Sequence, residues 1–313
     1  MSKEINKILI DKRYSEPIAV QQIIKGVRKE VYNEATGKTN LVGDGEIVWD
    51  IKDRRPHGHF IVGYQKKSKE PDIYTGLKLI SKGTSKVGYE IIGSLDIDIE
   101  ISRDEKIWES WSGEDIDLNA GDVLCIRNNK DTLSINPSNY FHFKFAYRNE
   151  EIEAVGNCNS LINYKDASPY CFYSLFSYGY GLVKAPDLPS LIAPDGCYNK
   201  MFYLCQQLIQ VPDLAATSLG IQCYAQMFSD CYSLIEAPIL YATTDLGRAC
   251  YSQMFQFCNN LKSIKIYYGG AINTVRFRAW VDGVSPTGVF YYNGSTTTRG
   301  SSAIPEGWTV ETF

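Results

Sequence analysis

The stretch CYAQMFSDCYSLIEAPILYAT, residues 223–243, decides how this chain folds, because the sequence repeats it with variations. Related copies open CFYSLFSYGYGL at Cys171, CYNKMFYLCQQL at Cys197 and CYSQMFQFCNNL at Cys250. Their first cysteines follow one another at intervals of 26, 26 and 27 residues. A fixed period of this length is typical of stacked supersecondary units, each of which buries its apolar face against the next. Such stacks usually present a surface to a partner.

Three residue types keep this period and predict a buried core. They are the cysteines, phenylalanines and leucines at Cys171, Cys197, Cys205, Cys223, Cys231, Cys250, Cys258, Phe176, Phe202, Phe228, Phe255, Leu182, Leu208, Leu234 and Leu261. Free cysteine packs well as a small apolar residue, so we expect reduced, structural cysteines in internal ladders. Some disulfides or a metal site are the alternatives, although CxxC pairs and matching histidines are absent.

The chain has 22 tyrosines, and their periodicity separates two expected roles. Tyr198, Tyr224 and Tyr251 recur with the repeat, which favours packing. Tyrosines outside the period are the better candidates for ligand binding, because stacking does not require them and the side chain suits contacts with glycans or proteins. These candidates are Tyr178, Tyr180, Tyr203, Tyr232 and Tyr241.

Within each unit the CYxxMF phrase predicts a short helix, and the following SLIEAPIL-like phrase predicts a strand. Proline inside the second phrase indicates that these strands are short or irregular. The tail from residue 268 onward breaks the period. A repeat array needs a terminal cap over its last open core, and we expect Trp280 and Trp308 to provide it.

Residues 73–150 predict an antiparallel β-sandwich. Between residues 95 and 101, Leu and Ile alternate with Asp and Glu, the period of a half-buried strand. Further short runs follow at sandwich-like spacing, namely KIWESW, DIDL, DVLCIRN and YFHFKFAY, with turns between them.

Residues 1–72 form the least regular part. The stretch from Ser15 to Tyr32 has apolar residues at helical spacing, and EIVWDI at residues 46–51 predicts a short strand. Residues 1–70 carry 14 Lys and Arg against 10 Asp and Glu, whereas the whole chain has a net charge of −4. We interpret this basic region as an attachment or oligomerisation segment, with an ordinary small subdomain as the alternative.

Residues that could carry chemistry form no recognisable catalytic set. His57 and His59 are best explained by a polar loop, and Asp96, Asp98 and Glu100 by a solvated strand face, with a cation site as the alternative. Glycosidase-like pairing is a minor alternative for the acidic residues Asp104, Glu105, Glu109, Glu114, Asp115 and Asp117. All three histidines precede the repeats, so we expect no enzyme, metal or cofactor.

The composition of the chain limits the classes of partner that we expect. The small net charge of −4 does not suggest a dedicated nucleic-acid binder. The first residues lack the apolar run of a signal peptide, and no stretch approaches the length of a membrane span. We therefore expect no membrane insertion and no export by the chain's own signal.

The combination of MFxxCxxL with the APxLPAT-like phrases resembles the BspA-type leucine-rich repeats of Bacteroidales surface proteins, and above all the repeat proteins encoded by gut Bacteroidales and their phages, including crAss-like phages. The resemblance covers about residues 75–313 and includes ISRDEKIWESW, NAGDVLCIRNN, GNCNSLINYKD and IPEGWTV. The array departs from typical adhesins in having only about four units, and its first unit lacks the Met and the second Cys.

Residues 1–72 lie outside this resemblance, and we expect them to form the attachment region. For the rest of a multidomain α+β/β protein, the resemblance implies a β-sandwich (73–150), a BspA-type leucine-rich-repeat solenoid (151–267) and a C-terminal cap (268–313). It implies a non-enzymatic, surface-exposed protein used in adhesion or virion decoration. Because the first residues lack a signal peptide, we expect a virion-surface protein, a head or tail fibre or decoration, that is made in the host cytoplasm. The expected partners are capsid or tail proteins, host-surface or mucosal glycans or proteins, and further copies of the chain. A bacterial cell-surface adhesin is the alternative, and a carbohydrate-active enzyme is a third possibility.

Overall fold

The computed structural model divides the chain into two compact units, Met1–Glu70 and Pro71–Phe313. Side chains are described from residue 76 onward. The structure describes residues 6–10, 29–33, 38–42, 46–51, 60–65, 76–145, 151–164, 166–243 and 245–313.

The described residues of the first unit form two small sheets. One has β1 parallel to β2 and β2 antiparallel to β3, and the other is the antiparallel pair β4–β5. Their bounds are β1 Asn6–Ile10, β2 Lys29–Asn33, β3 Lys38–Val42, β4 Glu46–Ile51 and β5 Phe60–Gln65. The strand predicted at residues 46–51 is confirmed. The predicted helix is wrong at its C-terminal end, which is strand β2, while its earlier part, His57 and His59 lie outside the described residues.

The second unit begins with two sheets, of strand order β10-β7-β12 and β14-β13-β6-β11-β8-β9. Their pairs are antiparallel except β13–β14, which is parallel. The bounds are β6 Leu77–Ser81, β7 Ser85–Ile92, β8 Ile99–Ser102, β9 Glu109–Ser110, β10 Ile116–Leu118, β11 Val123–Asn128, β12 Tyr140–Phe145, β13 Ile152–Val155 and β14 Leu182–Lys184. Alternate residues such as Leu79, Val87, Leu124 and Phe141 are buried in one core, so the prediction of a β-rich region is confirmed.

The strand predicted from Leu95 is shorter than expected and starts at Ile99. The Oδ1 of Asn128 accepts a hydrogen bond from the backbone N–H of Asp98 at 3.1 Å. The N–H of Asp98 therefore bonds to a side-chain oxygen and not to a backbone carbonyl of the neighbouring strand, and the regular strand begins one residue later. Leu95 still packs against the core, so the alternation of the sequence indicates burial correctly but overstates the strand.

The repeats contain a ribbon of turns in place of the predicted short helices. In the second unit, the N–H of Met201 donates to Tyr198 O three residues earlier, at 3.2 Å. The next N–H, that of Phe202, donates to Met227 O of the following unit, at 2.9 Å. Since every second N–H leaves the unit, the segment cannot be a helix, which satisfies its N–H groups internally. The described residues include only two short helical pieces, η1 Cys158–Ile162 and α1 Thr274–Phe277, so the α component of the predicted fold class is nearly absent.

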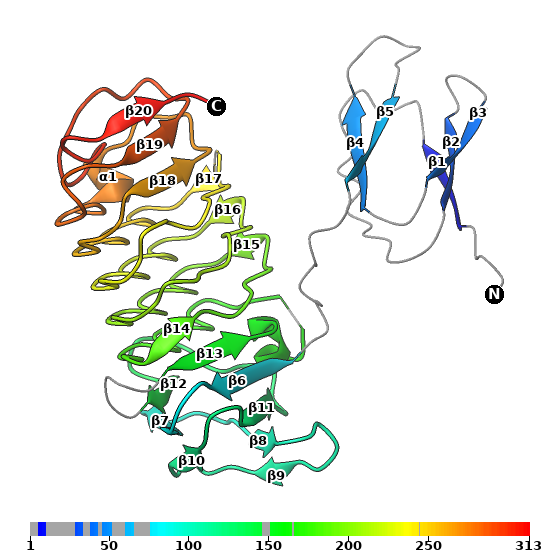
Figure 1. Cartoon of the computed structure of the whole chain (residues 1–313), viewed down its shortest axis with the longest axis vertical. Helices are drawn as coiled ribbons and strands as arrows, with labels where there is room; N and C mark the ends of the chain where they lie inside the picture. Colours follow the sequence, from blue (N-terminus) through cyan, green and yellow to red (C-terminus); the bar gives the residue numbers. More distant parts are fainter. Residues whose placement is uncertain are drawn as a thin grey trace. The chain divides into compact units, whose positions relative to one another are not determined.

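Successive units pair in parallel through two-residue strands. These are β15 Ile192–Ala193, β16 Ser218–Leu219 and β17 Asp245–Leu246. The proline phrases, predicted as strands, reduce mostly to isolated bridges such as Lys184↔Gln210 and Glu236↔Ser263, because proline has no N–H to donate. Figure 1 shows the units following one another along a single direction from β14 to β17.

A last parallel sheet ends the second unit. It consists of β18 Ser263–Ile266, β19 Val289–Tyr292 and β20 Thr309–Glu311. Trp280 is buried, its ring centre 6.1 Å from that of Phe255, and its Nε1 donates to Ala303 O at 2.7 Å. Trp308 is buried and donates to Ser285 O at 2.7 Å. Trp280 thus packs on the last repeat as expected, whereas the hydrogen bond of Trp308 lies within the tail.

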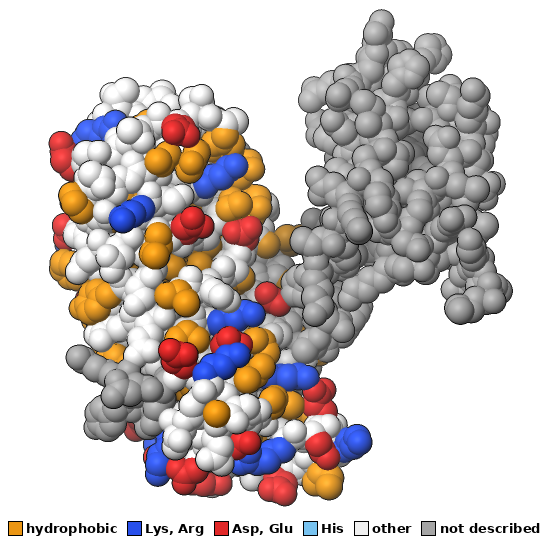
Figure 2. Space-filling view, viewed as in Figure 1, with side chains coloured by type: hydrophobic (Ala, Val, Ile, Leu, Met, Phe, Trp, Pro, Cys, Tyr) orange, Lys and Arg blue, Asp and Glu red, His pale blue; other side chains and the backbone are white. Residues whose placement is uncertain are grey.

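No helix in the described parts of the chain has the length and apolar character needed to cross a membrane. On the face shown in Figure 2, acidic and basic side chains are most frequent over the end that holds β8–β10. Apolar side chains are scattered over the coils of the repeats.

Candidate functional site

The periodic aromatic residues form two ladders inside the array. In the first, Phe143 of β12 stacks on Phe176, and Phe202, Phe228 and Phe255 follow with ring centres 5.2, 5.5, 5.5 and 5.8 Å apart. The ladder therefore begins in the preceding sheet, outside the sequence repeat. All these rings are buried, so the periodic phenylalanines hold the units together.

The second ladder contains the periodic tyrosines. Phe172, Tyr198, Tyr224, Tyr251 and Phe277 follow one another with ring centres 5.6, 5.7, 6.0 and 5.1 Å apart. The three tyrosines are buried. Their predicted role in packing is confirmed.

All nine cysteines are free and buried. In the last three units the second cysteine donates its Sγ–H to a phenylalanine carbonyl of the preceding unit: Cys205 to Phe176, Cys231 to Phe202 and Cys258 to Phe228, at 3.2, 3.2 and 3.0 Å. Burial raises the pKa of the Cys171 thiol to about 11 and that of Cys250 to about 12. These thiols are therefore protonated and unsuited to nucleophilic chemistry. Leu182, Leu208, Leu234 and Leu261 are also fully buried.

The tyrosines predicted to bind a ligand all reach the surface to some degree. Tyr178 is 50% and Tyr232 36% exposed, and Tyr180, Tyr203 and Tyr241 are half-buried. Three of them meet in what we call the tyrosine cluster (Tyr178, Tyr180 and Tyr203). The ring of Tyr178 lies edge-on to those of Tyr180 and Tyr203, with centres 6.5 and 5.6 Å apart.

The other two candidates have different neighbours. The hydroxyl of Tyr232 donates to Asp230 Oδ1 at 3.2 Å. Tyr241 stacks on Tyr267 with ring centres 5.3 Å apart, and Tyr267 contacts Phe313 at 5.0 Å. The structure therefore brings together three of the five predicted tyrosines and places Tyr241 in a separate aromatic stack.

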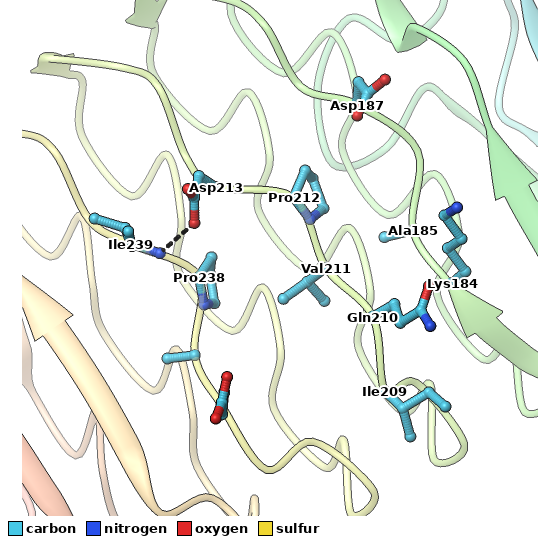
Figure 3. Close-up of a pocket in the computed structure, with 12 residues that line it drawn as sticks. Lys184, Ala185, Asp187, Ile209, Gln210, Val211, Pro212, Asp213, Pro238 and Ile239 are labelled. Carbon is cyan, nitrogen blue, oxygen red and sulfur yellow. Dashed lines mark hydrogen bonds between the residues drawn. The ribbon is translucent and has the colours of Figure 1, made fainter. Parts of the chain in front are cut away.

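A groove of about 550 Å³ runs along the proline phrases of three successive units. Figure 3 shows Lys184 and Asp187 of the first unit, Pro212 and Asp213 of the second, and Ile239 of the third around it. Asp213 Oδ1 accepts a hydrogen bond from the backbone N–H of Ile239 at 2.9 Å, so this carboxylate links two units. Partial burial raises the pKa of Asp187, against the opposing effect of Lys184.

Local pairing explains why the groove lies at this position. Bridges join Lys184 to Gln210 and Glu236 to Ser263, whereas the second and third units are bridged further along, at Leu214↔Leu240. Pro212 and Pro238, which line the groove, have no N–H to donate, and the bridge between their units lies beyond them. The groove was not predicted from the sequence, although the three proline phrases that line it could have indicated it.

Most of the acidic residues weighed as catalytic or cation-binding candidates are held by local partners. Asp104 Oδ1 accepts from the N–H groups of Lys106 and Ile107 at 2.8 and 3.1 Å, and these bonds lower its pKa. Ion pairs join Asp96 to Lys130, Glu100 to Arg127, Glu105 to Lys78, Asp115 to Lys144 and Asp117 to Lys86. In the part of the chain that the structure describes, no group of three or more His, Cys, Asp or Glu could hold a metal ion.

Comparisons of this chain with known protein families, with curated proteins and with solved structures find no match.

Proposed function

We propose that this protein is a non-enzymatic structural component of a phage virion surface, a fibre or decoration of head or tail, that presents a BspA-type leucine-rich-repeat array for adhesion to host-surface or mucosal glycans. The observation that carries this proposal is the pair of aromatic ladders. They fill the interior of the array with packing groups, while the five candidate tyrosines are at least partly exposed. Such a body is suited to contact rather than to reaction.

Cysteine usage favours the virion over the alternative, a bacterial cell-surface adhesin. Nine free, buried thiols are typical of a protein made and folded in a reducing compartment, whereas exported proteins tend to pair their cysteines. A phage structural protein is made in the host cytoplasm and reaches the outside only in the finished particle. The resemblance to phage-encoded repeat proteins favours the same choice.

Residues 1–72 are proposed to attach the protein to a capsid or tail protein and to form oligomers. Several copies on one particle bind by avidity, so that a weak contact at each tyrosine cluster adds up to firm adhesion. This arrangement requires no tight site on any single chain.

An adsorption assay tests the adhesive part of this proposal. Purified full-length protein is added in excess to host cells before the phage, and free particles are counted. We expect the protein to bind the cells and to slow adsorption of the phage in a dose-dependent manner, with heat-denatured protein as the control. Unchanged adsorption, together with no binding of the protein to the cells, would refute the adhesive role.

A further inference from the structure

A second pocket, of about 360 Å³, lies where strand β12 meets the first repeat unit, and it is called the junction pocket here. Asp115, His142 and Lys144 line it from the sheet side, and Tyr178 and Tyr180 from the repeat side. We propose that the junction pocket binds one uncharged pyranose ring of a glycan. This inference rests on the proposed adhesive function and specifies its ligand. The volume is near the lower end of the range of about 300–1,000 Å³ for small-molecule sites.

The backbone fixes both sides of the junction pocket. The N–H of Phe143 in β12 donates to Leu175 O of the first repeat unit at 2.9 Å, which ties the strand to the array. His142 and Lys144 flank Phe143 in this strand. On the other side, the N–H of Tyr178 donates to Tyr203 O at 2.8 Å. The polar and the aromatic walls are therefore held in place before any ligand arrives.

Tyr178 supplies a surface on which a sugar ring can stack. Its side chain is half exposed, and its two aromatic neighbours in the tyrosine cluster meet it edge-on, at interplanar angles of 67° and 89°. A pyranose has a flat apolar face of C–H groups, which packs well on an aromatic ring. An amphipathic tyrosine is well suited to this contact.

The sheet side of the junction pocket, which we call the polar wall, offers sugar hydroxyls both a hydrogen-bond donor and an acceptor. The charges of these two groups cancel. Lys144 Nζ lies 3.6 Å from Asp115 Oδ1, so a donor and an acceptor stand side by side. The pair depends on Gly88, since a Cβ there would lie 2.5 Å from Asp115 Oδ1 and 3.2 Å from Lys144 Cε. Because the two charges cancel, the pocket favours a neutral sugar over a uronate or a sialic acid.

His142 adds a polar atom that needs a partner. Its Nδ1 is buried and has no hydrogen-bond partner among the described residues, while its Nε2 lies 3.5 Å from Glu90 Oε2. A buried polar atom left without a hydrogen bond destabilises the folded protein. Because Nδ1 has almost no accessible surface, a sugar hydroxyl pairs with it only where the imidazole turns toward the junction pocket on binding.

Saturation-transfer NMR and calorimetry on the full-length protein test the inference. The probes are methyl glucopyranoside, galactopyranoside and mannopyranoside, with methyl glucuronide and N-acetylneuraminic acid as charged controls. We expect at least one neutral pyranoside to bind with a Kd of about 1–10 mM, as is fitting for a single ring of few contacts. The charged sugars should bind at least tenfold more weakly.

Two pocket variants and one matched control locate the binding. Tyr178→Ala and Lys144→Ala should each weaken binding of the neutral sugar at least tenfold. Tyr164→Ala, which removes an exposed tyrosine outside the pocket, should bind as the wild type does. Near-ultraviolet circular dichroism checks that each variant keeps its ladders. Absence of saturation transfer from every neutral pyranoside, preference for a charged sugar, or full binding by Tyr178→Ala would overturn the proposal.

The result is separable from that of the adsorption assay. If the protein competes with the phage for host cells but binds no neutral pyranoside, the junction pocket is not the glycan site and the adhesive function stands. If the sugars bind in the pocket but the protein does not bind host cells, the adhesive function fails and the pocket remains a sugar site.

Discussion

Phe228 illustrates what a periodic residue does in this chain. It is fully buried, and its ring stacks between those of Phe202 and Phe255 with centres 5.5 and 5.8 Å apart. Its carbonyl also accepts the Sγ–H of Cys258. Each such residue therefore contacts the unit before it and the unit after it, which explains why the sequence keeps it at every step.

Replacing Phe228 by Ala should lower the free energy of unfolding by about 3–5 kcal/mol, because it leaves a cavity in the middle of a ladder. Phe257→Ala is the matched control, since this phenylalanine of the next unit is 45% exposed. We expect it to change the free energy by less than about 1 kcal/mol. Urea unfolding followed by circular dichroism measures both, and equal effects would contradict the ladder's role.

The cysteines should be inert in the folded protein. Burial raises their pKa values, that of Cys171 to about 11, and encloses the sulfur atoms. Ellman's reagent at pH 8 should therefore detect almost no thiol in the native protein and all nine in guanidinium chloride. Rapid reaction of the native protein would show that the array is open, and fewer than nine thiols after unfolding would reveal disulfides.

His142 should make stability depend on pH. Burial lowers its pKa below the ordinary value of about 6.5, with Glu90 acting in the opposite direction and Lys144 in the same one. The unfolded chain therefore takes up this proton at a higher pH than the folded protein, and the free energy of unfolding falls as the pH drops below about 6.5. His142→Gln, which cannot titrate, should lose less stability between pH 8 and pH 5.5 in urea unfolding. Equal losses in the two proteins would contradict this assignment.

At the scale of the element, the ribbon of turns is the main feature that the sequence did not predict. Cys223, Tyr224, Met227 and Phe228 are buried at steps of one, three and one. This spacing fits a helical period of 3.6, but it also fits a turn that repeats every four residues. The structure has the second arrangement, with positive φ at Gln222, Gln226 and Asp230. The burial of these side chains could be predicted from the sequence. The backbone conformation could not, because a helix and a ribbon of turns bury the same side chains.

Glycine at the coil corners permits the close approach of units. A Cβ on Gly247 would lie 2.3 Å from the carbonyl carbon of Gly220 in the preceding unit. Gly247→Ala should therefore force the coils apart and lower the free energy of unfolding by about 1–3 kcal/mol. Gly269→Ala is the control, because no atom lies within 4 Å of its Cβ position, and its effect should stay below about 1 kcal/mol. A harmless Gly247→Ala in thermal unfolding would contradict the close packing.

At the scale of the whole molecule, the β-rich region, the repeats and the tail of the second unit share one hydrophobic core, from Leu77 to Trp308. Periodicity predicted the repeats, and the tail that breaks the period predicted a cap, of which Trp280 packs on the last repeat. The sequence could not predict that Phe143 starts the first ladder or that His142 and Lys144 line the junction pocket, because these residues lie outside the period and only tertiary contacts bring them to the array. Three of the five candidate tyrosines form a cluster. The sequence could not predict that two of them line the same pocket as the polar side chains of the sheet, because the two segments are distant in the sequence.

The most direct test of the central claim, that the protein is a component of a phage virion surface, is gold-labelled antibody imaging. Antibody raised against the purified full-length protein is applied to purified phage particles and to uninfected host cells. We predict label at regular positions on the particles and none on the cells, and the position on the particle will distinguish head from tail. Label on the envelopes of uninfected cells, with none on particles, would contradict the virion assignment and support the bacterial adhesin instead.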